Sequence, residues 1–171
     1  MFTKWKEIAN KPLKFLDFLI TFILIALTIF FICYWPYIPE QVPQHWNSAG
    51  QIDDYADSGS YIMLLIMMYF FYAWHMISKI FPAFIQKDNL FGKENAARVT
   101  EQHVNKYIRT LFLMLWICDL TIQAVFAYII VSGVLLRNLG VWFLPTVFLL
   151  LSLDFIWFFS SILRQKRECL T

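Results

Sequence analysis

One short polar segment carries most of the side chains in this chain that can do chemistry in contact with water. His45 is followed by Asp53, Asp54 and Asp57. Imidazole nitrogen and carboxylate oxygen are both zinc ligands, so these four side chains are weak candidates for a metal site. One histidine without a cysteine is a thin ligand set, and we therefore expect neither a metal nor another cofactor. A membrane enzyme would depend on His45, but we expect a non-enzymatic role.

Two further interpretations of the same segment involve no catalysis. In the first, His45, Trp46, Asn47 and Asp53 hydrogen-bond with one another and fix a lid. In the second, these residues and Tyr55 form a surface that binds an external ligand. The segment has no lysine or arginine, and its acids would attract a cationic peptide: Glu40, Asp53, Asp54 and Asp57. A fixed lid can also be a binding surface, so the two interpretations are compatible.

A second group of polar side chains lies within strongly apolar stretches. An ionised group at the centre of a bilayer costs about 2.5–3.5 kcal/mol, so such residues need a partner or a proton. At about 1.5 Å of helical rise per residue, Asp119 and Asp154 lie roughly 16 Å and 14 Å from the inner ends of their stretches. They can therefore lie at one depth and share a proton, or each can be protonated and bonded to a neighbouring helix.

Three more polar residues belong to these apolar stretches. Gln123 lies one helical turn after Asp119 on the same face. Asp17 is near enough to the inner interface to reach water, and His75 is interpreted as a packed or interfacial histidine. The candidate intramembrane polar set is therefore Asp119, Gln123, Asp154 and His75.

The elements that position these residues are predicted to be membrane helices. Of the 171 residues, 60% are apolar and 15% charged, against roughly 45–50% and about 25% in an ordinary soluble domain. About 20 apolar residues cross the hydrocarbon as a helix, which pairs all of its backbone groups internally. Four stretches qualify: 15–34, 61–80, 108–132 and 141–163. The predicted fold is an all-α membrane protein with four transmembrane helices in a single domain, 1–171.

The basic residues predict how the helices are oriented. Of the fourteen lysines and arginines, all but Arg137 fall in the two terminal segments or in and around the connection 81–107. Positive charge collects on the cytoplasmic side, so both termini and this connection are expected inside. The helix formers of 93–107 predict a cytoplasmic extension that leads into the third helix. The polar segment, within the connection 35–60, is then outside.

The composition of the outer connection indicates order rather than a flexible tether. Pro39 and Pro43 restrict their own backbone and push the preceding residues toward extended geometry. Asparagine and glycine in 47–50 are typical of a turn. We therefore expect a folded lid over the outer end of the helices.

The lid segment resembles a known family. The pattern PxxVPxHWNxxGxxDxY, which begins at Pro39 and ends at Tyr55, is similar to the small membrane domain of unknown function in SdpI-type bacterial immunity proteins. The resemblance covers about the first 60–80 residues, and a basic residue that many members carry after the tyrosine is missing. It implies a multi-pass protein of the bacterial cytoplasmic membrane that protects a producer cell from a secreted toxic peptide. A cytoplasmic repressor held at the membrane is a further implied partner.

Two functions are therefore expected, and they depend on different residues. The leading one is non-enzymatic immunity, in which the outer loop recognises a toxic peptide or another envelope ligand. The alternative is a small transporter, or a transporter subunit, that uses Asp119 and Asp154 and depends on a proton or ion gradient. Membrane lipid is an expected partner in both. Direct nucleic-acid binding is not expected, because the chain lacks a basic block with interleaved aromatic residues.

Overall fold

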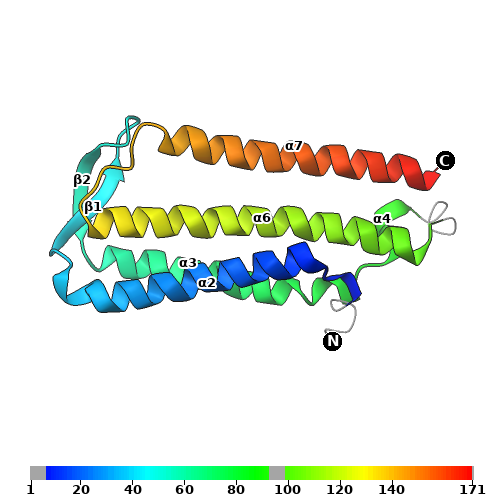
Figure 1. Cartoon of the computed structure of the whole chain (residues 1–171), viewed down its shortest axis with the longest axis horizontal. Coiled ribbons are helices and arrows are strands. Elements are labelled where there is room, and N and C mark those ends of the chain that lie inside the picture. Colours follow the sequence, from blue (N-terminus) through cyan, green and yellow to red (C-terminus); the bar gives the residue numbers. More distant parts are fainter. Residues whose placement is uncertain (1–6, 93–98, 171) are drawn as a thin grey trace.

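Four long helices make up most of the computed structural model, which describes residues 7–92 and 99–170 (Figure 1). Within these ranges, four helices are long and apolar enough to cross a membrane: α2 (Lys11–Tyr34), α3 (Ser60–Ser78), α6 (Glu101–Val134) and α7 (Phe143–Leu170). The predicted four-helix membrane fold is confirmed, and the direction of crossing stays a prediction. The shorter elements are η1 (Trp35–Tyr37), β1 (Gln41–Trp46), β2 (Ile52–Asp57), η2 (Phe81–Ala83) and α4 (Lys87–Phe91).

The third membrane helix is longer than the apolar stretch that predicts it. α6 begins at Glu101 because Thr100 caps it: the Thr100 hydroxyl accepts a hydrogen bond from the His103 backbone N–H at 3.4 Å. A threonine at this position satisfies one of the unpaired N–H groups of the first turn. The helix start lies within the extension expected over 93–107, of which residues 93–98 lie outside the described residues.

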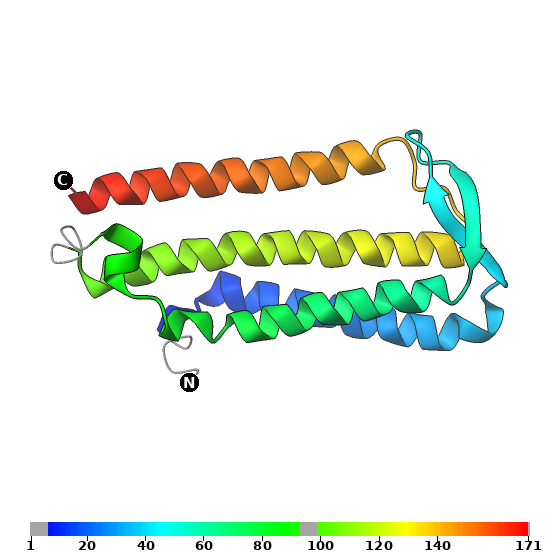
Figure 2. The same ribbon diagram turned by 180° about the vertical axis from the view of Figure 1, so that it is seen from behind.

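The helices pack around α6, which contacts α2, α3 and α7. In both views α7 runs beside α6 and stands apart from α2 and α3 (Figures 1 and 2). The start of α2 and the end of α7 lie at one end of the bundle, and the two strands lie at the other. Four crossings place both chain ends on one side, in agreement with the charge pattern.

The buried core has two parts along the bundle. The part near the strands consists of Leu24, Leu27, Phe31, Val42, Tyr61, Met68, Ile130 and Val134. The part at the other end consists of Ile8, Leu13, Ile20, Phe91, Val99, Val104, Ile108, Phe112 and Trp116. Many large apolar side chains of the four helices are exposed on the outer surface. That surface suits a hydrocarbon solvent, because a water-soluble monomer exposes few contiguous apolar patches of this kind.

The expected lid between the first two helices is ordered and contains a β-hairpin. β1 and β2 pair antiparallel, with Gln41 opposite Asp57 and Trp46 opposite Ile52. The pairing is irregular between Pro43 and Trp46, in a strand that contains a proline and therefore lacks one ladder N–H. This two-stranded sheet was not part of the all-helical prediction. The name hairpin is used below for residues 41–57.

Candidate functional site

The turn of the hairpin is built around Asn47. Its side-chain oxygen accepts hydrogen bonds from the backbone N–H groups of Ala49 (2.9 Å) and Gln51 (3.0 Å). The Gly50 N–H donates to the Asn47 carbonyl at 2.8 Å. Asparagine side chains stabilise turns in this way, so the amide oxygen of Asn47 is committed to the hairpin itself.

The turn is held against the connection between α6 and α7. The Gly50 carbonyl accepts from the Leu139 N–H at 2.8 Å, and the Asn138 side-chain oxygen accepts from the Ile52 N–H at 3.0 Å. Gly50 has φ +71°, and a Cβ there would collide with the backbone of Gly140. The connection 135–142 between α6 and α7 therefore belongs to the lid as well. The hairpin and residues 135–142 together are called the cap.

A buried tyrosine joins the cap to the helices. The Tyr61 hydroxyl donates to the Pro43 carbonyl at 2.6 Å, and Tyr61 is only 1% exposed. A Cβ on Gly133 would occupy the place of this hydroxyl. The glycine thus lets the ring of Tyr61 lie directly on α6. Val42 of β1 is fully buried in the same region, so β1 belongs to the core as well as to the cap.

The expected mutual bonding of the four lid residues is found in part. His45 Nδ1 and Asp53 Oδ1 lie 2.6 Å apart, with side chains 66% and 41% exposed. Trp46 instead donates from Nε1 to the Arg137 carbonyl at 3.3 Å. The fifth candidate, Tyr55, is 51% exposed.

The other two acids of the hairpin make local hydrogen bonds. Asp54 accepts from the Tyr55 N–H at 2.9 Å, and Asp57 accepts from the Gly59 N–H at 2.7 Å. His45, Asp53, Asp54 and Asp57 were the weak candidates for a metal site. The described residues contain no group of three or more histidine, cysteine, aspartate or glutamate side chains that could hold a metal ion. The exposed acids of β2 therefore act as a negative surface and as local caps.

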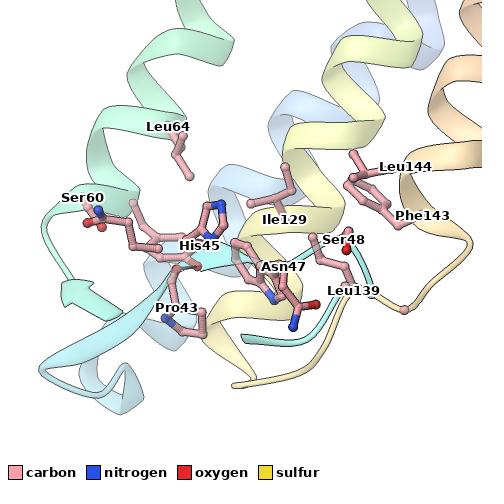
Figure 3. Close-up of a pocket in the computed structure, with 15 residues that line it drawn as sticks. Pro43, His45, Asn47, Ser48, Ser60, Leu64, Ile129, Leu139, Phe143 and Leu144 are labelled. Atoms are coloured by element: carbon pink, nitrogen blue, oxygen red, sulfur yellow. Dashed lines mark hydrogen bonds between the residues drawn. The ribbon is translucent and has the colours of Figure 1, made fainter. Parts of the chain in front are cut away.

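A cavity of about 430 Å³ lies between the hairpin and the adjacent ends of α3, α6 and α7 (Figure 3). Its polar edge is formed by hairpin residues His45, Trp46, Asn47 and Ser48. Its apolar wall is formed by Tyr61, Leu64, Ile129, Leu139, Phe143 and Leu144. Three of the predicted ligand-binding residues line the cavity, whereas Asp53 and Tyr55 do not. A mainly apolar cavity with a few polar groups at its edge is the usual form of a small-ligand site.

A second site lies inside the helix bundle, where three helices each supply charged groups. Asp17 Oδ1 of α2 lies 2.9 Å from His75 Nε2 of α3 and 2.6 Å from Lys79 Nζ. His75 Nδ1 lies 3.0 Å from Asp119 Oδ2 of α6, although the two groups are poorly aligned for a hydrogen bond. The Lys79 ammonium lies 5.5 Å from the centre of the Trp116 ring. Asp17, His75, Lys79 and Asp119 are called the intramembrane cluster.

The cluster must hold protons besides those of the lysine. An ionised carboxylate only accepts hydrogen bonds, so the contact between His75 Nε2 and Asp17 needs a proton between the two groups. If His75 also carries a proton on Nδ1, that proton lies beside Asp119, and the two negative and two positive charges of the cluster cancel. Cancellation matters because an unpaired charge is costly in the membrane.

The other intramembrane candidates have separate partners. Asp154 Oδ2 accepts from the Cys118 thiol at 2.9 Å. Gln123 is fully buried and donates to the Met68 carbonyl at 3.1 Å. Asp119 faces His75 instead. No contact among the described residues therefore supports a proton shared by Asp119 and Asp154, and helix depth alone did not reveal which way each carboxylate faces.

Sequence reasoning missed two members of the cluster. Asp17 was assigned to the interface and Lys79 was counted only as a cytoplasmic cation, yet Lys79 is 7% exposed. A signal was present, because His75 and Lys79 are four residues apart and share one face of a helix. Two basic side chains on one face near a membrane boundary predict an acidic partner on a neighbouring helix.

The hairpin lies within a segment that matches a known family. Residues 22–69 match the model of a domain of unknown function, DUF1648. The match extends from α2 through the hairpin into α3 and covers less than half of the chain. No curated protein and no solved structure shows a significant match. The four apolar helices fit a multi-pass membrane protein, and residues 22–69 are similar to a membrane-associated domain family of unknown function.

Proposed function

We propose that this protein is a non-enzymatic immunity-type protein of the bacterial cytoplasmic membrane, which recognises a toxic peptide or another envelope ligand through the cap. The cavity under the hairpin supports this proposal. Backbone hydrogen bonds and Tyr61 fix its roof on both sides, and an ordered roof lowers the entropy that binding costs. Three of the residues predicted to bind an external ligand, His45, Trp46 and Asn47, lie at its edge.

The surroundings of His45 favour recognition over catalysis. A nucleophilic mechanism needs a hydroxyl or thiol within hydrogen-bond reach of the imidazole. Among the described residues, the side-chain contact of His45 is with Asp53, and no hydrogen bond links it to a serine. The imidazole is therefore oriented by Asp53 at the edge of an apolar cavity, which suits a recognition group. The acids of β2 would steer a cationic peptide toward this end of the molecule.

The test is protection in cells that depend on this protein. A strain lacking the gene is challenged with concentrated culture supernatant of the parent strain and complemented with wild type, His45→Ala, Trp46→Ala or Gln41→Ala. Gln41 is an exposed hairpin residue outside the cavity, so its variant is the matched control. Growth is compared at equal membrane levels. We expect the first two variants to lose protection and Gln41→Ala to keep it; full protection by all three would remove the hairpin from the mechanism.

A second candidate function, proton-coupled transport, is favoured by one observation. His75 lies between two carboxylates from different helices, an arrangement that can accept and release a proton. Sequence reasoning placed this role on Asp119 and Asp154, and the contacts of Asp119 now connect it to the intramembrane cluster.

Purified protein in vesicles with an internal pH-sensitive dye and an imposed potassium diffusion potential measures proton flux directly. Transport predicts a flux that Asp119→Asn abolishes, because an amide cannot carry a proton. Asp154→Asn is the paired variant, since Asp154 contacts Cys118 rather than the cluster. A wild-type flux equal to that of empty vesicles would exclude this candidate.

A further inference from the structure

Two hollows meet at the hairpin end of the molecule. The first is the cavity under the hairpin, and the second is a groove of about 530 Å³ between α6 and α7. Leu139 and Phe143 line both hollows. This shared wall is held in place by Tyr128, whose hydroxyl donates to the Leu139 carbonyl at 3.0 Å and whose ring stacks on Phe143 at 5.3 Å. The cavity and the groove are therefore neighbours on the two sides of Leu139 and Phe143.

The groove has the length of one membrane leaflet. It follows α6 from Leu120 to Tyr128, and on the other side it runs from Trp142, just before α7, to Leu150 of α7. Eight helical steps of 1.5 Å give about 12 Å, close to half of the roughly 30 Å hydrocarbon core. Trp142 and Leu150 are 76% and 50% exposed, so the groove is open to the surroundings of the helix pair. In a membrane these surroundings are lipid chains.

The cavity end of this combined site is polar and carries no fixed charge. Side chains of His45, Asn47, Ser48 and Ser60 supply hydrogen-bonding groups there. Among the described residues that line the cavity there is no lysine, arginine, aspartate or glutamate. A charged headgroup would lose water there without gaining an opposite charge, which is costly. An uncharged head with hydroxyl and carbonyl groups suits this lining better.

We infer that the cap and the groove together bind an uncharged glycerolipid of the adjacent leaflet. Its polar head lies under the hairpin, and one acyl chain lies between α6 and α7. This inference rests on the proposed function, because it names the class of envelope ligand that the cap recognises. It also explains why α7 packs chiefly on α6 and leaves an apolar groove along that contact.

Photolabelling of the purified full chain in phosphatidylcholine vesicles tests the inference. The probe is a diacylglycerol with a diazirine in one acyl chain, and the comparison probe is phosphatidylglycerol with the same chain. Labelled positions are found by mass spectrometry of peptides. Ala124→Trp fills the groove from α6, and Val147→Trp fills it from α7. Ala26→Trp, at an exposed alanine of α2, is the matched control.

We expect the diacylglycerol probe to label the segments 120–128 and 142–150. Each groove variant should weaken this labelling about tenfold, the change that about 1.4 kcal/mol of binding free energy gives, and Ala26→Trp should leave it unchanged. Because the groove is filled from either helix, a folding defect in one variant leaves the other informative.

Two results would overturn the inference. Labelling spread evenly over all lipid-facing helices and unchanged by both groove variants would mean ordinary solvation by the bilayer. Equal or stronger groove labelling by phosphatidylglycerol would reject the uncharged head. The proposed function is judged separately: if groove labelling fails while His45→Ala still loses protection, the cap recognises a ligand of another class. If labelling succeeds while the cap variants keep protection, the lipid site stands and the immunity role falls.

Discussion

Histidine side chains contact aspartate at two sites in this molecule, one exposed and one buried. On the hairpin, His45 and Asp53 lie 2.6 Å apart with side chains 66% and 41% exposed. In the intramembrane cluster, His75 lies 2.9 Å from Asp17 and 3.0 Å from Asp119, and its side chain is only 1% exposed. The exposed contact is the shorter one. The distance between the charged atoms is therefore not enough to compare the interaction energies of the two sites, because their burial differs so widely.

The difference shows that burial decides what a pair of this kind does. Two unit charges 4 Å apart attract by about 1 kcal/mol in water and by about 4 kcal/mol at an effective dielectric constant of 20. The hairpin pair competes with water and can exchange partners at little cost, which suits a surface that meets ligands. The cluster joins three helices, and the loss of His75 would leave Asp119 without its partner inside the bundle. We therefore propose recognition as the role of the cap, and cohesion or proton storage as the role of the cluster.

The largest expected effect tests the assumption that the hairpin lies in water outside the cell. In a background with the native cysteines replaced, Ser48→Cys should react with an impermeant thiol reagent on intact cells. Asn89→Cys, at the other end of the bundle, should react only after the membrane is opened. The effect is all-or-none, because a charged reagent does not cross the bilayer. The reverse labelling pattern would place the hairpin in the cytoplasm and remove external recognition.

The next largest effect is expected inside the cluster. His75→Leu leaves Asp119 facing an apolar side chain and takes one of the two partners from Asp17. Breaking a buried ion pair costs about 3–5 kcal/mol, and we expect a loss of this size in the free energy of unfolding in detergent micelles. His75→Gln, which keeps a hydrogen-bonding group, should lose less. His103→Leu is the control at a half-buried histidine outside the cluster, and a His75→Leu effect no larger than that control would contradict the role of the cluster.

The sequence predicts the membrane helices of this fold better than it predicts the hairpin between them. Four apolar stretches were enough to locate the membrane helices, because hydrocarbon permits few other backbone structures. The hairpin was expected only as a folded lid with extended backbone before Pro39 and Pro43, and a proline such as Pro43 is unusual in an interior strand position. In the structure β1 pairs with β2 along one edge only, so its other edge needs no backbone N–H from Pro43. The Pro43 carbonyl accepts a hydrogen bond from the Tyr61 hydroxyl.

The site was harder to predict, because its contacts join residues far apart in the chain. The turn at Asn47 is a local feature, and the asparagine and glycine of residues 47–50 were enough to predict it. Asn138 and Leu139 support that turn because of where α6 ends and α7 begins. The sequence around Asn47 carries no information about this long-range contact. Asp119 and Asp154 illustrate the same limit: helical rise gave their depth, but their direction depends on packing that turned Asp119 toward His75.

A smaller effect is expected where the cap closes on itself. Gly50 and Gly92 both have positive φ, but only Gly50 has backbone atoms where a Cβ would lie. Alanine at positive φ costs about 1–2 kcal/mol at either position, and Gly50→Ala adds an overpacking cost of about 1–3 kcal/mol. Hydrogen exchange over 41–57 should therefore speed up in Gly50→Ala and stay unchanged in Gly92→Ala. Equal exchange in both variants would mean that the hairpin does not depend on its contact with residues 135–142.

The smallest effect is expected at the exposed pair. His45→Ala should change the free energy of unfolding by about 0–1 kcal/mol, the usual value for an exposed ion pair. A double-mutant cycle with Asp53→Asn measures the coupling between the two side chains, which we expect to lie in the same range and to shrink with added salt. The result matters because the same His45→Ala variant is expected to lose protection in cells. A large loss of function with a negligible loss of stability would separate recognition from folding. A coupling as large as that of the buried cluster would instead make His45 a structural residue of the hairpin, and the contrast between the two histidines would fail.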